Sequence, residues 1–406
     1  MTIETGKHII DFLYREYENP NSFFLKKDKT KSIILDFIGG EPLLEPELID
    51  QILEYFIQKG IELNSPLIDL FKINITTNGY NFKTKKVQDF FEKYRDFLTM
   101  TASIDGTQEL HDAHRITKEG KPTFDNAKKA FEQIGTDLGI RSTKMTFVPS
   151  SFPNIFDSIK FMLEDMNSDY IACNYAYEPK YTQEDAKELY YQLKKTADYL
   201  IDTNNDTYIT ILADQIGFPI DYEKNDRNFC GGTGDMLAFA PDGKAYPCLR
   251  YCPISIGDEL ASKVCIGDTN NIYETKQGQI IRKEFEQIKL STQSSEECLK
   301  CPIATGCGYC SAYNYEVTGS FNKRVTNICP VHKARVAAVC YFHNKRYVEL
   351  GKGAPKKVNL TKEDALKFLS LEEWQEIKQL EYYALLKSFY SYCQENPNFN
   401  PNELFD

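Results

Sequence analysis

Cysteine is distributed very unevenly along this chain. Ten of its twelve cysteines lie between Cys230 and Cys340, and the first cysteine in the sequence is Cys173. Two Cys-x2-Cys pairs stand in one run, Cys298-x2-Cys301-x5-Cys307-x2-Cys310. The N-terminal stretch is charged and amphipathic, unlike a signal peptide, so we expect a cytoplasmic protein, in which disulfides are disfavoured. Paired cysteines in that compartment predict metal ligands, for structural zinc or for iron–sulfur clusters.

Charge and composition exclude some partners. The chain has 406 residues, enough for two or three domains, and a formal net charge of −11. An acidic protein is a poor match to nucleic acid or to an anionic membrane surface. No apolar run reaches the roughly 18 residues of a membrane span. With 26 Tyr and 26 Phe the chain can build a sizeable core, so we expect a globular protein without a nucleic-acid or membrane partner.

The first half of the sequence alternates between two hydrophobic patterns. Short β-branched runs predict strands at 33–38, 71–76, 97–104, 144–148 and 170–175. Helical periodicity lies before and between them, at about 4–17, 46–59, 84–94, 124–134 and 154–165. Such alternation predicts βαβ units around a parallel sheet, here an α/β partial barrel, with functional loops at the carboxyl ends of the strands.

The second half has a different character. A long helix at 183–202 leads out of the barrel region, and short apolar segments then alternate with Gly, Pro and Cys. A helix is predicted at 330–349, a linker at 351–357 and further helix to about residue 392. We therefore divide the chain into a partial barrel (1–205), a loop-rich cysteine module (206–350) and a C-terminal linker and helical segment (351–406).

Polar motifs follow three successive predicted strands. Gly39-Gly40-Glu41-Pro42-Leu43-Leu44 comes after the first, Thr76-Thr77-Asn78-Gly79 after the second and Ser103-Ile104-Asp105-Gly106 after the third. The run His111-Asp112-Ala113-His114-Arg115 comes next. Each motif alone is compatible with ordinary turn chemistry, because Asn-Gly and Asp-Gly are common turn formers. Three clusters at one edge of a parallel sheet favour a ligand site instead.

In this order and spacing the motifs resemble radical S-adenosylmethionine (SAM) enzymes, over roughly residues 1 to 200. The resemblance implies that Gly39, Gly40 and Glu41 hold the methionine amino group of SAM. It places Thr77, Asn78 and Ser103 near the ribose and carboxylate, and the strand end at 146–149 near the adenine. Arg115 would either place a carboxylate or pair with Asp112 at the surface.

One element of that family is missing from the sequence. The family binds a catalytic [4Fe–4S] cluster through C-x3-C-x2-C, and SAM chelates the iron that the three thiolates leave open. The barrel half has Cys173 alone, which reads better as a small core residue. Three explanations remain open: an N-terminally truncated version of an active enzyme, a relative without the cluster that binds but does not catalyse, or a cluster supplied from elsewhere. The polypeptide as written is expected not to cleave SAM.

The cysteine module resembles the SPASM domain, a C-terminal extension of some radical SAM enzymes that carries two auxiliary [4Fe–4S] clusters. The pattern departs from that family at one point, because Cys307 and Cys310 are separated by two residues instead of three. The resemblance implies one cluster held by four cysteines, Cys298, Cys301, Cys307 and Cys329. It implies a second held by Cys230, Cys248 and Cys310. For this cluster we choose Cys252 as the fourth ligand; the alternative is that its fourth iron is open to substrate. We expect Cys265, Cys340 and Cys393 to be unligated.

The family implies a reaction class. SPASM enzymes include sulfatase maturases, in which an Asp after the Tyr-Pro-Cys element acts as base, and here Leu249 follows Cys248. The run from Cys301 to Tyr315 is closer to maturases of cysteine-rich or CXXX-repeat peptides. We therefore expect a thioether or related crosslink in such a precursor peptide, formed by 5′-deoxyadenosyl radical chemistry with a flavodoxin- or ferredoxin-type reductant. The alternative is a non-catalytic iron–sulfur or zinc scaffold that binds peptide; whether the chain is an enzyme stays open.

Overall fold

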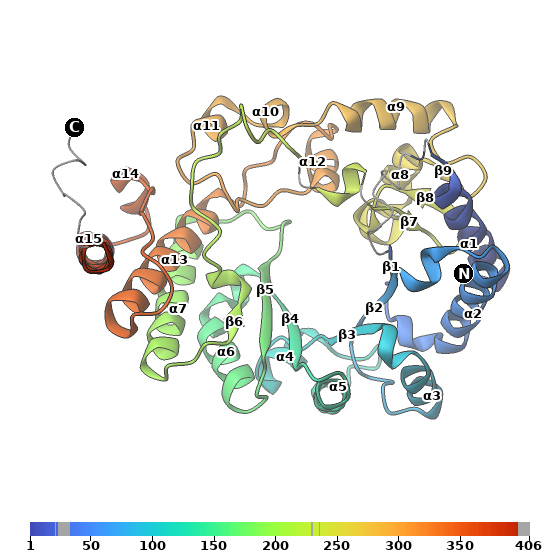
Figure 1. Cartoon of the computed structure of the whole chain (residues 1–406), viewed down its shortest axis with the longest axis horizontal. Coiled ribbons are helices and arrows are strands. Elements are labelled where there is room, and N and C mark those ends of the chain that lie inside the picture. Colours follow the sequence, from blue (N-terminus) through green and yellow to red (C-terminus); the bar gives the residue numbers. More distant parts are fainter. Residues whose placement is uncertain (21, 23–32, 229, 235, 397–406) are drawn as a thin grey trace.

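A parallel β-sheet of six strands forms the first half of the molecule. The computed structural model describes residues 1–20, 22, 33–228, 230–234 and 236–396 (Figure 1). The strands pair side by side in sequence order, each parallel to the next. They are β1 (Ile33–Phe37), β2 (Phe71–Thr77), β3 (Leu98–Ala102), β4 (Ser142–Phe147), β5 (Tyr170–Tyr175) and β6 (Tyr208–Ile209).

Helices connect these strands and cover the outside of the sheet (Figure 1). They are α1 (Ile3–Glu18), α2 (Pro46–Glu62), α3 (Lys85–Tyr94), α4 (Gln108–His114), α5 (Phe124–Leu138), α6 (Ile155–Glu164) and α7 (Gln183–Asp202). Local signals set their ends: Thr182 and Asp185 form a capping box on α7, and Gly139 ends α5 with φ of +74°. The expected α/β parallel fold is confirmed, and five strands lie where the pattern predicts them. Strand β6, with two residues, gave no periodic signal.

The cysteine module has a small sheet and more helix than the sequence suggests. Three short antiparallel strands form its sheet, β7 (Ala238–Phe239), β8 (Lys244–Tyr246) and β9 (Gly267–Asp268). Five helices surround it: α8 (Pro253–Val264), α9 (Lys276–Glu286), α10 (Leu290–Gln293), α11 (Glu296–Leu299) and α12 (Ser311–Thr318). The aromatic rings of Tyr251, Phe285 and Phe321 pack together in a core separate from that of the barrel.

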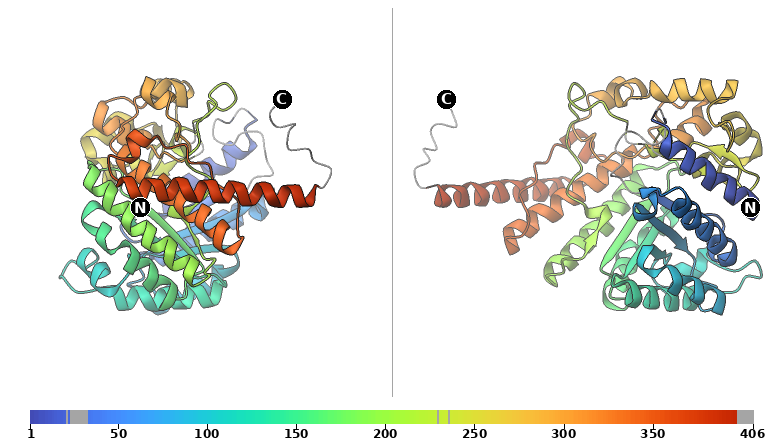
Figure 2. Two further views of the ribbon diagram at one scale, coloured as in Figure 1. Left: turned by 90° about the vertical axis from the view of Figure 1, so that its left-hand side faces the viewer. Right: turned by 45° about the vertical axis from the view of Figure 1, so that its right-hand side comes forward.

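The C-terminal helices pack on the barrel side of the molecule. Helix α13 (Cys329–Leu350) packs against α7, and the short α14 (Lys362–Ala365) and the long α15 (Leu371–Glu395) follow it. Side chains of α13 and α15, such as Val336 and Ile377, are buried in the same core as the sheet. Farther along, α15 projects from the rest of the molecule (Figure 2). The residues after 396 in the expected C-terminal segment lie outside the described part of the chain.

Helix α1 belongs to both cores. Its Ile10 and Tyr14 are buried with the barrel, and the Tyr14 hydroxyl donates to the Phe56 carbonyl oxygen at 2.8 Å. Its Phe12 is buried in the module core, where the ring packs edge-on against Phe239. One helix with apolar side chains on two faces therefore joins the sheet to the module. Among the described residues, no helix is both long and apolar enough to cross a membrane.

Candidate functional site

The Glu41 carboxylate ties together the ends of two neighbouring strands. Glu41 is the N-cap of a short 3-10 helix (Pro42–Leu44) after β1, and its Oε1 accepts from the Leu43 backbone N–H at 3.0 Å. The same oxygen accepts from the Thr77 hydroxyl at 2.8 Å, and Oε2 accepts from the Asn78 N–H at 2.6 Å. Three donors hold this side chain in one orientation at the carboxyl edge of the sheet.

The other residues expected at this edge lie beside Glu41. Gly39 and Gly40 are exposed, and a methyl group added to either would meet no atom of the described residues within 4 Å, so a ligand has room to approach the backbone. The backbone N–H of buried Ser103 donates to the Thr77 carbonyl oxygen at 2.9 Å. The structure thus brings the ends of β1, β2 and β3 together. The Thr77 hydroxyl itself is engaged, since it donates to Glu41 and accepts from the Gly79 N–H at 3.0 Å.

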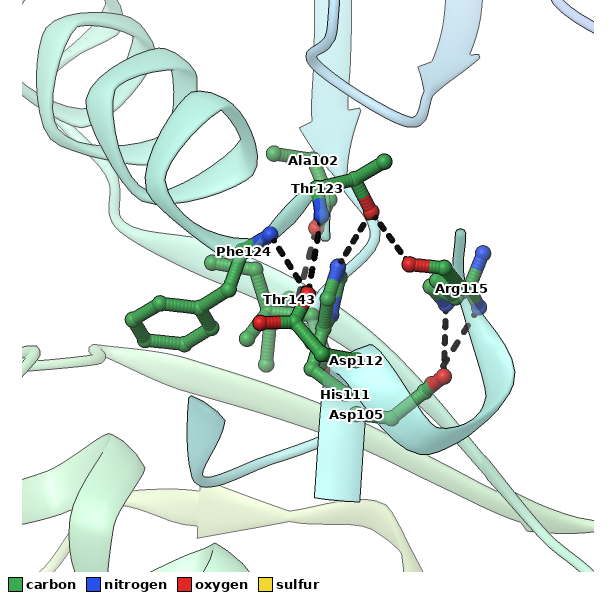
Figure 3. A network of polar contacts seen from close by, with 9 residues as sticks. Ala102, Asp105, His111, Asp112, Arg115, Thr123, Phe124 and Thr143 are labelled. Carbon is green, nitrogen blue, oxygen red and sulfur yellow. Dashed lines mark hydrogen bonds and ion pairs between the residues drawn. The ribbon is translucent and has the colours of Figure 1, made fainter. Parts of the chain in front are cut away.

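Arg115 pairs with Asp105, which corrects one of the two sequence expectations for it. Its Nε and Nη2 donate to the two oxygens of Asp105, at 2.5 and 3.2 Å (Figure 3). Asp112 instead accepts from the backbone N–H groups of Thr123 and Phe124, at 2.8 and 2.9 Å, at the start of α5. The reason is local: Arg115 is the C-cap of α4 and is extended (φ −118°, ψ 91°), so it leaves the helix face that would bring it to Asp112.

A buried histidine supports this ion pair. The Thr123 hydroxyl donates to the Arg115 carbonyl oxygen at 2.7 Å and lies 3.1 Å from His111 Nε2 (Figure 3). Because the hydroxyl hydrogen goes to Arg115, Nε2 of His111 carries the hydrogen that Thr123 accepts. Burial and the Arg115 charge lower the pKa of His111, and Asp105 and Asp112 oppose that shift. A neutral imidazole therefore holds the segment between β3 and α5.

Two groups of thiols lie in the module, and we name them by size. The four-thiol group comprises Cys298, Cys301, Cys307 and Cys329. Burial and the other three thiols, opposed by the charge of Arg324, together raise the pKa of Cys307 to about 11. The pKa of Cys329 is likewise raised by burial and by two of these neighbours. These four cysteines are partly buried, and a set of several thiolates is what a soft metal centre prefers.

The three-thiol group comprises Cys230, Cys248 and Cys310. A methyl group placed on Gly232 would lie 3.1 Å from the Cys248 sulfur and 3.7 Å from that of Cys230, so both sulfurs border one small space. Burial and, to a smaller extent, the thiols of Cys230 and Cys310 raise the pKa of Cys248 to about 12, against the effect of hydrogen bonds from the backbone of Arg250 and Tyr251. The sulfur of Cys230 also lies 3.1 Å from the Ser311 hydroxyl. The donor sets of the two groups fit thiolate-bound clusters.

The choice of Cys252 as the fourth ligand of the three-thiol group stays a prediction. The Cys252 sulfur points back to the Cys248 carbonyl oxygen at 3.9 Å, and the thiol is buried in the module core. Burial and the charge of Asp242 raise its pKa to about 11. Cys173 and Cys340 are buried in the barrel core. In the described ranges, no group of three or more His, Cys, Asp or Glu side chains is arranged to hold a single metal ion.

Sequence reasoning missed the residues that join the barrel mouth to the module. Arg250 donates from Nη2 to the carboxylates of Glu178 and Glu316, at 3.1 and 2.6 Å. The side-chain amide of Asn327 donates to the carbonyl oxygens of Tyr177 and Pro179, at 2.6 and 2.9 Å. These contacts link segments far apart in the sequence, and no short motif marks them.

Comparisons with known proteins place this geometry in context. No protein-family profile matches the sequence. Over 346 residues the chain is 20% identical to the radical SAM cyclopropyl synthase TigE of Paramaledivibacter caminithermalis, an alignment that covers 82% of this chain and 62% of the relative. The chain thus spans less than two thirds of that relative's length.

Solved structures with a similar fold include two of the protein anSMEcpe. The histidine-tagged form with bound AdoMet (SAM) superposes with a TM-score of 0.58 and 14% identity, over 91% of this chain and 89% of that one. The native form with AdoMet and the Cp18Cys peptide has a TM-score of 0.56 and 15% identity, over 82% and 88% of the two chains. The parallel sheet, the cysteine module and these similarities give one conclusion: the chain has a fold similar to that of radical SAM/SPASM proteins such as anSMEcpe.

Proposed function

We propose that this chain is the SAM-binding and auxiliary-cluster part of a radical SAM maturase that modifies a ribosomally made peptide. The observation that carries the proposal is the coexistence of two features in one fold. One is the Glu41–Thr77–Asn78 edge of the parallel sheet, and the other is the pair of thiol groups in the module.

The strand edge suits the amino-acid part of SAM. The positively charged amino group needs acceptors, and Glu41 offers a fixed carboxylate beside the open backbone of Gly39 and Gly40. The carboxylate of SAM needs a donor, and the Arg115 guanidinium, one-third exposed, is held at the same end of the sheet by Asp105. Both partners are oriented before the ligand arrives, which lowers the entropic cost of binding.

The thiol groups suit two auxiliary [4Fe–4S] clusters, one held by the four-thiol group and one by the three-thiol group. When bound, such clusters exchange electrons and can bind a substrate thiolate at an open iron. We propose that Cys252, whose sulfur contacts the Cys248 carbonyl oxygen, is not a ligand, so that the second cluster keeps an iron for a ligand from outside the group. A peptide cysteine is a suitable ligand, and this favours a cysteine-rich precursor peptide as substrate.

For the bond formed, we propose a thioether or a related crosslink. Support for a peptide substrate comes from the structure of anSMEcpe with a bound peptide. The relative TigE is named a cyclopropyl synthase, so a product closed by a carbon–carbon bond is a related possibility for this chain. A sulfatase-type base after Cys248 does not fit, because Leu249 packs its apolar side chain against the module core.

The proposal is tested on anaerobically purified and reconstituted protein in two steps. Iron and acid-labile sulfide should be present in equal amounts, and zinc should be absent; a zinc protein without sulfide would refute the clusters. SAM should then bind in equilibrium dialysis, and binding should weaken in the Arg115→Lys variant. Production of 5′-deoxyadenosine with reductant is expected once an in-frame C-x3-C-x2-C segment, if the gene encodes one upstream of Met1, is included.

The second candidate is a non-catalytic scaffold that binds peptide. It predicts clusters and peptide binding without 5′-deoxyadenosine from any natural form of the protein, and a gene with no C-x3-C-x2-C motif in frame upstream.

A further inference from the structure

The loop that follows β5 is clamped to the module from several directions. We call residues 177–179 the clamp loop. Asn327 donates to two of its carbonyl oxygens, and the Tyr313 hydroxyl donates to the Glu178 carbonyl oxygen at 3.1 Å. Arg250 pairs with the Glu178 carboxylate. A loop at the barrel mouth with this many partners in the module is a fixed connection between the two parts.

Inside this connection, the hydroxyl of Tyr177 lies against the segment that joins the two thiol groups in the sequence. A methyl group on Gly308 would come within 2.8 Å of the Tyr177 Oη, so the phenol tip rests against the Gly308 backbone. Gly308 stands in the segment between Cys307, of the four-thiol group, and Cys310, of the three-thiol group. Arg324 holds this segment by donating to the carbonyl oxygen of Cys307 at 2.8 Å.

The electrostatic surroundings of Tyr177 agree with this position. Burial raises the pKa of its phenol, and the thiols of Cys310, Cys230 and Cys307 raise it further, whereas Arg324 lowers it. Both thiol groups thus contribute to the field at one hydroxyl. A phenol is protonated at neutral pH and can donate one hydrogen bond.

We propose that Tyr177 is a positioning residue whose hydroxyl donates a hydrogen bond to the sulfur of an auxiliary cluster and so sets its reduction potential from the barrel side. The proposal rests on the proposed function, because it needs clusters on the two thiol groups. Hydrogen bonds to the sulfurs of an iron–sulfur cluster are among the factors that set its potential. The reduced cluster carries one more negative charge, so a donor favours reduction and its loss opposes it.

The test is a potentiometric titration followed by EPR on reconstituted wild-type protein and the Tyr177→Phe variant. We expect the variant to keep its iron and sulfide and to lose about tenfold in the equilibrium constant for reduction of one cluster, which is about 59 mV for a one-electron couple. The Gly308→Ala variant keeps the Tyr177 hydroxyl, but its added methyl group would displace that hydroxyl. It should therefore lower the reduction potential of the same cluster, as Tyr177→Phe does.

Tyr313→Phe is the matched control, because it removes one hydroxyl from a partner of the same loop. The charges that act on Tyr313 are those of Glu178, Glu316 and Arg250, with no thiol among them. The reduction potentials of the clusters in Tyr313→Phe should equal those in the wild type. Equal potentials in Tyr177→Phe and wild type, with full iron content, would overturn the inference alone. A wild-type protein that takes up no iron and sulfide would overturn the proposed function and this inference with it.

Discussion

The hydroxyl of Thr77 donates to the carboxylate of Glu41 at 2.8 Å, across the carboxyl ends of two adjacent parallel strands. This contact joins two motifs that are separate in the sequence. It also fixes the carboxylate that we assign to the amino group of SAM. Its strength can be tested by a change that keeps the size of the side chain.

Glu41→Gln should weaken SAM binding about tenfold and lower the free energy of unfolding by about 1–3 kcal/mol. The amide can accept on one side, but its NH2 group must then face either the Asn78 N–H or the Leu43 N–H, both of which are donors. Equilibrium dialysis with SAM and urea denaturation measure the two effects. Glu45→Gln, at an exposed position four residues on, is the control and should change neither. Equal SAM affinity in both variants would contradict the assignment.

The proximity of Glu41 and Thr77 could be predicted from the sequence, because it follows from general rules of strand prediction and sheet topology. β-branched runs predict strands, alternation with helices predicts a parallel sheet, and parallel strands end at one edge. The Arg115–Asp112 alternative failed because it assumed that the helix continues, whereas α4 ends at His114. The contact of Tyr177 with Gly308 has no local signal at all, since it depends on how the module docks on the barrel.

The helices and the metal ligands of the cysteine module could be predicted from the sequence only in part. Helices α8 to α12 are short, and Gly, Pro and Cys interrupt their apolar pattern. Hydrophobic periodicity alone therefore predicts loops where the structure has helices. The grouping of the cysteines came from the family resemblance, apart from the choice of Cys252. Their role as ligands stays a prediction.

The ion pair of Arg115 with Asp105 should contribute to stability through its geometry. Arg115→Lys keeps the charge but loses the forked contact with two oxygens, and we expect a loss of about 1–2 kcal/mol in the free energy of unfolding. Arg95→Lys is the control, because Arg95 is exposed and lies 3.7 Å from Glu92; it should change stability by less than about 0.5 kcal/mol. Urea denaturation measures the free energy of unfolding of both variants. Equal losses of stability in Arg115→Lys and Arg95→Lys would contradict a stabilising role of the forked contact.

His111 should make the stability of the protein depend on pH. Its pKa in the folded state is lowered, so below the ordinary pKa of about 6.5 the unfolded chain binds the proton and the folded chain resists it. Stability therefore falls as the pH drops from about 6.5 toward the lowered pKa, by at most about 1.4 kcal/mol per pH unit. The difference between wild type and His111→Gln, measured by urea denaturation from about pH 7.5 to about pH 5, isolates this contribution.

In that experiment His111→Gln should show a shallower loss of stability at acidic pH than the wild type. His114→Gln is the matched control, because His114 is exposed and lies three residues away on the same helix. It should follow the wild-type curve. A His111→Gln curve that runs parallel to the wild type across the range would show that His111 does not carry the pH dependence.

The orientation of Cys252 leads to a last prediction about the three-thiol group. Cys248→Ser removes a sulfur that borders the space shared with Cys230, so we expect the loss of one cluster's iron and sulfide. Cys252→Ser removes a sulfur directed to the Cys248 carbonyl oxygen, so the iron content should stay at the wild-type value. Metal analysis and the EPR signals of the reduced proteins measure this. If Cys252→Ser also lost a cluster, Cys252 would be the fourth ligand after all, and the open iron proposed for the peptide thiolate would not exist.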